Sequence, residues 1–92
     1  MEHLMIDLET MDNKPTAAIT AIGAVLFNPE TGALGETFYC RVSLASSVDY
    51  DCTMGAETVL WWLRQSSEAR SELINDTCSS LNTAISELYH FI

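Results

Sequence analysis

Hydrophobic residues follow a strand-like pattern in the first half of the chain. Residues 3–8 form a short apolar run, and its length favours a strand buried on both faces. Residues 18–27 form a longer run with Gly23 in its middle, where we expect a bulge or a close backbone approach. Residues 34–44 alternate apolar and polar side chains, as in a strand with one solvated face. The pattern therefore predicts a three-stranded antiparallel meander.

The second half of the chain changes to helical spacing. A polar stretch over residues 45–52 leads to Thr53 as the N-cap of a helix. The apolar residues that follow as far as Leu63 fall on one helical face. The serines at positions 66–67 can end this helix or begin another. We therefore expect one or two helices in this region.

The last segment has the strongest amphipathic pattern. Asp76 is expected to be its N-cap, and apolar residues then recur at steps of three and four as far as Ile92. The pattern reaches the end of the sequence with no C-cap glycine and no polar tail. This apolar finish predicts that residues 1–92 are a single partial domain, the front part of a larger one.

Composition and charge limit the classes of function. A 48% hydrophobic and 18% charged chain suits a compact globule, and no apolar run approaches the roughly 20 residues of a membrane span. The net charge is −9, with only four lysines and arginines. That balance works against electrostatic binding of a phosphate backbone. A nucleic-acid partner would therefore need a divalent cation or basic surface on another chain.

The three cysteines indicate free thiols. They lack a Cys-x-x-Cys spacing, and the two histidines lie at opposite ends of the sequence, so no zinc pattern is present. Free thiols suit a reducing cytoplasm, which is the location we expect.

The residues that suggest chemistry are Asp7 and Glu9. Side chains two positions apart on a strand project from the same face. Two adjacent carboxylates repel each other, and a divalent cation such as Mg²⁺ or Mn²⁺ relieves this repulsion through hard oxygen ligands. The spacing alone more often marks only the solvated end of a strand than a metal site, so both interpretations stay open here.

Four segments carry a resemblance to a known family. Residues 3–11, centred on Asp-Leu-Glu-Thr, resemble the first motif of the DEDD-type 3′–5′ exonucleases, which have the ribonuclease H-like fold. Residues 21–25 resemble the second strand of these enzymes. Residues 58–66, with a tryptophan pair, and residues 84–92 look like helices of the exodeoxyribonuclease VIII-like and ribonuclease T-like group, found in enterobacteria and their prophages. We expect at least one tryptophan in the core, and one of the pair could stack on a base.

The resemblance implies roles for the matching residues. Asp7 would ligate both ions of a two-ion Mg²⁺ or Mn²⁺ site, and Glu9 would hold one ion near the nucleophilic water. Thr10 and Met11 would lie against the 3′-terminal nucleotide. The implied activity is hydrolysis of phosphodiester bonds at the 3′ ends of DNA or RNA. The implied fold is α/β and ribonuclease H-like but incomplete, so an α+β assignment is also expected.

The family's remaining acidic ligands and its general base belong to later motifs that these 92 residues do not contain. Asp49, Asp51 and Asp76 lie in contexts that do not match those motifs, and His90 precedes the place where they would begin. A general base must lie within hydrogen-bond reach of the attacking water. We therefore expect weak metal binding, and no exonuclease activity from this chain alone.

Two other functions stay open. The chain could be a non-catalytic prophage-type remnant that acts as a small oligomerising or protein-binding module, or a plain acidic domain in which the carboxylate pair is incidental. In the ribonuclease H-like fold the first strand is central. Without its parallel neighbour, residues 3–8 would form an open edge that invites pairing with another chain. We therefore expect a homo-oligomer formed through this edge.

Overall fold

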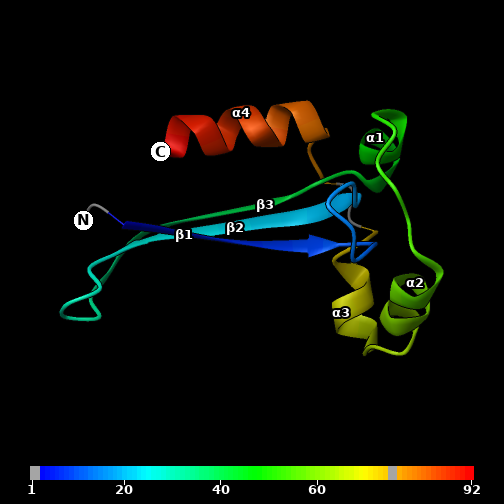
Figure 1. Cartoon of the computed structure of the whole chain (residues 1–92), viewed down its shortest axis with the longest axis horizontal. Helices are drawn as coiled ribbons and strands as arrows, with labels where there is room; N and C mark the ends of the chain where they lie inside the picture. The colour runs from blue at the N-terminus through cyan, green and yellow to red at the C-terminus, as the bar shows by residue number, and fades with distance from the viewer. Residues whose placement is uncertain (1–2, 75–76) are drawn as a thin grey trace.

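The computed structural model describes residues 3–74 and 77–92. Its sheet contains β1 (His3–Thr10), β2 (Ile19–Phe27) and β3 (Leu34–Arg41), antiparallel and in the order β1-β2-β3. Figure 1 shows a long, twisted sheet with one helix along a face and the other helices gathered at one end. The predicted meander is confirmed, and with the helices that follow it gives an α+β fold.

The described residues form four helices after the sheet. They are α1 (Leu44–Asp49), α2 (Ala56–Leu63), α3 (Ser67–Ser71) and α4 (Leu81–Phe91). One expectation is corrected here, because the third strand ends at Arg41 rather than at residue 44 and α1 begins at Leu44. Ser43 explains this difference, since its hydroxyl caps α1 and so turns the chain out of the strand direction. Among these helices, none has the length and apolar character that a membrane span requires.

Serine hydroxyls cap most of these helices. Ser66 and Ser80 accept hydrogen bonds from backbone N–H groups in the first turns of α3 and α4, as Ser43 does for α1. Gly55, not Thr53, is the N-cap of α2. The predicted cap at Thr53 is wrong because its hydroxyl donates to a distant carboxylate instead. Asp76, the other predicted cap, lies outside the described residues.

The strand β1 is far more exposed than its apolar sequence predicted. Met5, Ile6 and Leu8 keep 58%, 45% and 44% of their surface exposed. The prediction of a strand buried on both faces is therefore wrong. The physical reason is that, within the described residues, β1 pairs with β2 alone, while α4 contacts the sheet at β3. On the outer side of β1, residues 3–74 and 77–92 place no strand.

The core is divided into two clusters that fix the helices to the sheet. Between the sheet and α4 lie Ile22, Cys40, Val42, Leu81 and Ala84. Beyond the end of β1, Met11, Ala18 and Trp62 form a second cluster beneath α2. Because burial of apolar surface drives folding, these clusters determine where α2 and α4 lie relative to the sheet.

Gly32 and Gly23 lie in different backbone environments, the first in a hairpin loop and the second in a regularly paired strand. In the hairpin loop, Gly32 has a φ of 74°, a left-handed conformation that favours glycine. Gly23 pairs in regular register with Asp7, and a Cβ there would lie an ordinary 3.9 Å from the Asp7 carbonyl oxygen. The predicted bulge or close approach at Gly23 is therefore wrong. The register shifts occur instead after Glu9 and after Val25.

Candidate active site

Asp7 and Glu9 occupy alternate positions of β1 and therefore share one face of the sheet. Both side chains are exposed. Their cross-strand neighbours on β2 are small, Gly23 opposite Asp7 and Ala21 opposite Glu9. A small neighbour leaves space beside each carboxylate, so a ligand can approach the pair from this face.

Neither carboxylate has an ion-pair or hydrogen-bonded partner within residues 3–74 and 77–92. Two unpaired hard oxygen groups side by side fit the ligand preference of Mg²⁺ or Mn²⁺. Such an ion takes about six ligands, and the described part of the chain contains no group of three or more metal-binding side chains. The pair therefore fits a divalent cation in chemistry and supplies only part of its coordination sphere.

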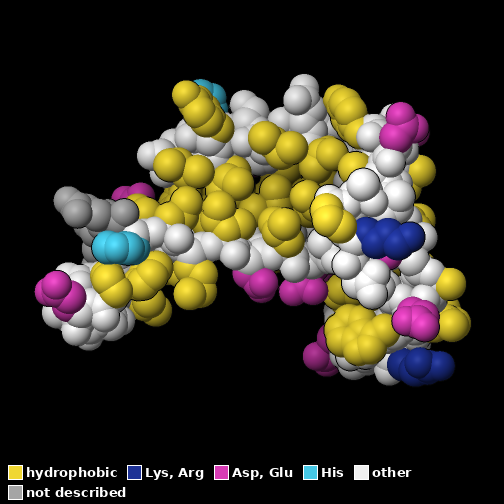
Figure 2. Space-filling view, in the orientation of Figure 1, with side chains coloured by type: hydrophobic (Ala, Val, Ile, Leu, Met, Phe, Trp, Pro, Cys, Tyr) yellow, Lys and Arg dark blue, Asp and Glu magenta, His cyan; other side chains and the backbone are white. Residues whose placement is uncertain are grey.

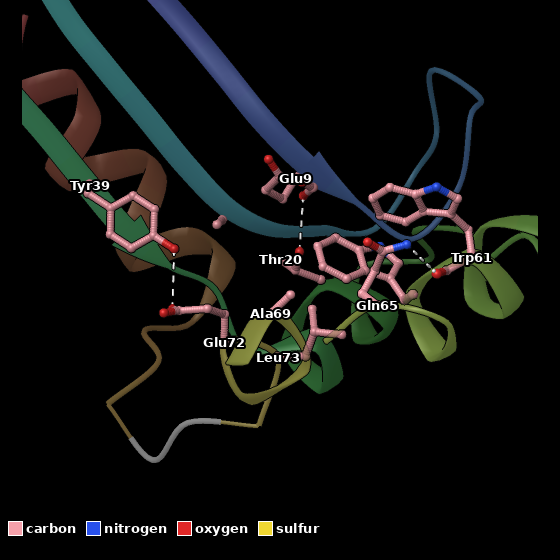
Figure 3. A pocket seen from close by; sticks show the side chains of 10 residues that line it. Glu9, Thr20, Tyr39, Trp61, Gln65, Ala69, Glu72 and Leu73 are labelled. Carbon is pink, nitrogen blue, oxygen red and sulfur yellow. Dashed lines mark hydrogen bonds between the residues drawn. The ribbon is translucent and has the colours of Figure 1, made fainter. Parts of the chain in front are cut away.

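A hollow of about 310 Å³ opens beside Glu9. Figure 3 shows Glu9 from β1, Tyr39 from β3 and Trp61 from α2 around this hollow. Its remaining lining comes from the start of β2, from α2 and α3 and from the residues that follow these two helices: Thr20, Ala21, Trp62, Gln65, Ala69, Glu72 and Leu73. The hollow thus combines a free carboxylate with aromatic and apolar walls.

The two tryptophans of α2 have different environments. Trp62 is 8% exposed, and its indole N–H donates to the Thr10 carbonyl oxygen at 3.0 Å. Trp61 is 52% exposed, with its ring at 5.1 Å from that of Trp62 in an edge-on arrangement. The prediction that at least one tryptophan packs in the core is confirmed. Trp62 positions the end of β1, whereas Trp61 leaves an aromatic surface in the hollow.

Thr10 and Met11 connect the carboxylate strand to the core. The Thr10 hydroxyl donates to the Asp12 carbonyl oxygen at 2.8 Å. The Met11 side chain is buried against Ala18 and Trp62. The contact with a 3′-terminal nucleotide that the resemblance implies for Thr10 and Met11 stays a prediction.

A comparison with protein-family models identifies the family of this chain. A family model described as the 3′-5′ exoribonuclease Rv2179c-like domain matches residues 2–92. The chain belongs to this family. The resemblance to 3′–5′ exonucleases is thereby confirmed, while the narrower grouping with exodeoxyribonuclease VIII-like and ribonuclease T-like enzymes stays a prediction. No curated protein and no solved structure matches the chain significantly.

In this exoribonuclease-like domain, a buried carboxylate fixes the loop that follows β1. Asp12 accepts hydrogen bonds from the Thr53 hydroxyl at 2.6 Å and from the Asn13 N–H at 2.8 Å. The Thr53 bond is the largest influence that holds the pKa of Asp12 below its usual value, with Lys14 adding a weaker attraction. The sequence indicated only a turn here, because Thr53 is 41 residues away.

An ion pair and a hydrogen bond stabilise the side of the hollow that Tyr39 and Glu72 form. Arg41 on β3 forms an ion pair with Glu72, and this pair lowers the pKa of the Glu72 carboxyl. Tyr39 donates to the same carboxylate at 3.5 Å. Partial burial and the Glu72 charge raise the pKa of Tyr39, so its phenol stays protonated at neutral pH. The β3 alternation already placed Tyr39 on the solvated face, but its position beside Glu9 requires the tertiary structure.

The Asp12–Thr53 bond predicts a specific acid sensitivity. Because the folded-state pKa of Asp12 is lowered, its stabilisation is present above its unfolded pKa of about 3.9 and is lost as pH falls through the lower folded value. Thr53→Val should lower stability at neutral pH and flatten the decline below about pH 4. Urea unfolding at both pH values tests this, with the exposed Thr37→Val as control. An unchanged acid decline in Thr53→Val would contradict the assignment.

Proposed function

We propose that the chain forms part of the catalytic site of a divalent-metal-dependent 3′–5′ exoribonuclease. Asp7 and Glu9 would hold Mg²⁺ or Mn²⁺, and the hollow beside Glu9 would receive the 3′-terminal nucleotide of an RNA. The observation that carries this proposal is a pair of unpartnered carboxylates on one sheet face, one of which, Glu9, lines an aromatic hollow. Membership in the exoribonuclease-like family supports the reaction class.

The charges of the site explain why a cation is needed. A phosphate that approached Asp7 and Glu9 would meet only like charge, and the nearby Arg41 is engaged by Glu72. When bound, the cation supplies charge neutralisation and activation of water. The chain's own contribution is orientation, since Trp61 offers a stacking surface worth about 1–3 kcal/mol per base. Binding of RNA should therefore depend on both a divalent ion and the aromatic wall.

The chain is expected to be inactive by itself. It supplies two carboxylates, and neither His3 nor His90 lines the hollow beside Glu9. A general base within reach of the water is therefore missing from the described residues around the hollow. Further ligands and the base would have to come from polypeptide outside these 92 residues.

Metal binding can be tested directly on the chain. Mn²⁺ titrated into ¹⁵N-labelled protein should broaden amide signals around Asp7 and Glu9 first, because paramagnetic broadening falls steeply with distance. Asp7→Asn and Glu9→Gln should each remove this selective broadening, whereas Glu30→Gln in the hairpin loop should leave it intact. Broadening that is spread over all acidic surfaces, or that survives both substitutions, would refute the metal site.

Activity provides a second measurement. With 5′-labelled RNA and Mg²⁺, the chain should trim 3′ ends no faster than Asp7→Ala does. Mg²⁺-dependent trimming that disappears in Asp7→Ala would show that the chain needs no further ligands. That result would overturn the proposed inactivity and leave the metal site intact.

The non-catalytic alternative, a small oligomerising module, is favoured by one observation. Part of β1 is apolar and exposed, and its outer edge has no strand beside it in the part of the chain that the structure describes.

A further inference from the structure

The polar side chains around the hollow beside Glu9 present mainly hydrogen-bond acceptors to a ligand. Three of its donors are already in use, because the Trp62 N–H and the Thr20 and Tyr39 hydroxyls each donate to an acceptor of the chain itself. The carboxylates of Glu9 and Glu72 line the same hollow. A ligand that offers N–H donors therefore fits this lining better than one that offers lone pairs.

Glu72 is the acceptor whose position is best fixed. Its Oε2 atom accepts hydrogen bonds from the Arg41 Nε–H and, at 3.5 Å, from the Tyr39 hydroxyl. The hydrogen-bonded ion pair with Arg41 lowers the pKa of the Glu72 carboxyl, so the group is ionised at neutral pH. Among residues 3–74 and 77–92, no group donates to its Oε1 atom. Because an ionised carboxylate can only accept, Oε1 is an acceptor held ready at the hollow.

Gln65 supplies a second acceptor. Its Nε2 atom donates to the Trp61 carbonyl oxygen at 2.9 Å. A carbonyl oxygen can only accept, so this bond determines which end of the Gln65 amide turns toward the backbone. The side chain is half-buried and lines the hollow. Its Oε1 atom receives no hydrogen bond from the described part of the chain and is left for a ligand.

An aromatic surface lies across the hollow from these acceptors. Figure 3 shows Tyr39 and Glu72 on one side and Trp61 on the other. A base stacked on the Trp61 ring does not meet the indole N–H, which lies in the plane of that ring. The volume of about 310 Å³ is at the lower end of the range for small-molecule sites. The hollow therefore suits a flat ring that carries N–H donors at its edge.

We propose that Glu72 selects a nucleobase that carries an exocyclic amino group, with Gln65 as the second acceptor. This inference rests on the proposed function, in which the hollow receives the 3′-terminal nucleotide. The amino group of cytosine or adenine donates to the Glu72 Oε1 atom. Uracil has a carbonyl oxygen where cytosine has its amino group, and so turns lone pairs toward the carboxylate. A site that hydrogen-bonds an N–H group disfavours an analogue without that group, because its own polar atoms then lose their partner.

Cytidine and uridine are the matched probes, because they share a sugar and a six-membered ring and differ at this amino group. They carry no phosphate, so their binding does not require the metal site. Titrated without metal into the ¹⁵N-labelled 92-residue chain, cytidine should shift the amide signals of Trp61 and Gln65. Uridine should bind about tenfold more weakly, as expected for the loss of one hydrogen bond to a charged group. Equal affinities, tighter binding of uridine, or no shift with cytidine would overturn the proposal.

Substitution of Glu72 tests its role in the preference. In Glu72→Gln the side chain keeps an acceptor for Arg41 but can also donate to uracil, so the cytidine-to-uridine ratio should fall toward one. Glu68→Gln is the matched control, because Glu68 is an exposed glutamate of α3 that does not line the hollow. Trp61→Ala should weaken both nucleosides alike, since stacking tolerates every base. A tenfold preference that survives Glu72→Gln would overturn the assignment to Glu72.

The comparison of cytidine with uridine on the unmodified chain needs no variant, so it tests the proposal even where Glu72→Gln disturbs folding. It also separates this inference from the proposed function. Selective Mn²⁺ broadening at Asp7 and Glu9 without a preference for cytidine would overturn only the base selection. A preference for cytidine without selective broadening would overturn only the metal site. The dark blue and magenta groups in Figure 2 show how few cations accompany the acidic side chains on the visible face.

Discussion

Replacement of Trp62 by alanine is expected to remove most of the free energy of unfolding, so that a large fraction of the molecules is unfolded. Trp62 is buried against Met11 and Ala18, and large-to-small changes of buried aromatic residues cost about 3–5 kcal/mol. The change also leaves the Thr10 carbonyl oxygen without the indole N–H that now reaches it at 3.0 Å. A domain of this size has a small stability margin, so a loss of this magnitude removes most of it.

Two matched variants separate the contributions of Trp62. Trp62→Phe keeps a buried aromatic ring but removes the hydrogen bond and part of the apolar volume, so it should cost about 1–3 kcal/mol. Trp61→Ala removes a neighbouring ring of the same type that is exposed, and it should cost less than about 1 kcal/mol. Urea unfolding followed by circular dichroism measures all three. Equal losses for Trp61→Ala and Trp62→Ala would contradict the division between core and surface.

The second large effect is expected at Gly55. A Cβ at this position would lie 2.4 Å from the Asp12 Oδ1 atom and 3.1 Å from its Cγ. The Asp12 carboxylate cannot move away freely, because Thr53 and Asn13 hold it. The φ of −99° suits any residue, so lack of space is the reason for glycine here. Gly55→Ala should therefore destabilise the fold by about 1–3 kcal/mol.

Gly23→Ala is the control for this prediction. Its Cβ would meet nothing closer than 3.9 Å, and alanine loses less backbone entropy than glycine on folding, by about 0.5–1 kcal/mol. The variant should be neutral or slightly more stable in the same urea experiment. A Gly55→Ala variant as stable as Gly23→Ala would show that Asp12 is not held in place.

Features that depend on neighbouring residues were predictable from the sequence. The meander follows from apolar alternation, from the turn residues between β2 and β3, and from Gly32, whose N–H bonds back to the Asn28 carbonyl at 2.9 Å. The shared face of Asp7 and Glu9 follows from strand geometry alone. The helix caps were predicted less well, since a serine hydroxyl that closes a turn competes with other polar residues nearby.

Features that depend on distant residues were decided only by the tertiary structure. The sequence determined that one tryptophan of the pair would be buried, but the bond from Trp62 to Thr10, across 52 positions, decided which one. The hollow beside Glu9 and the Asp12–Thr53 bond likewise join segments far apart in the chain. Hydrophobic composition made β1 look like a buried strand, and its place at the sheet edge left it exposed. Local sequence patterns determine from which face of a strand or helix a side chain projects, whereas packing between distant elements determines which residues that side chain contacts.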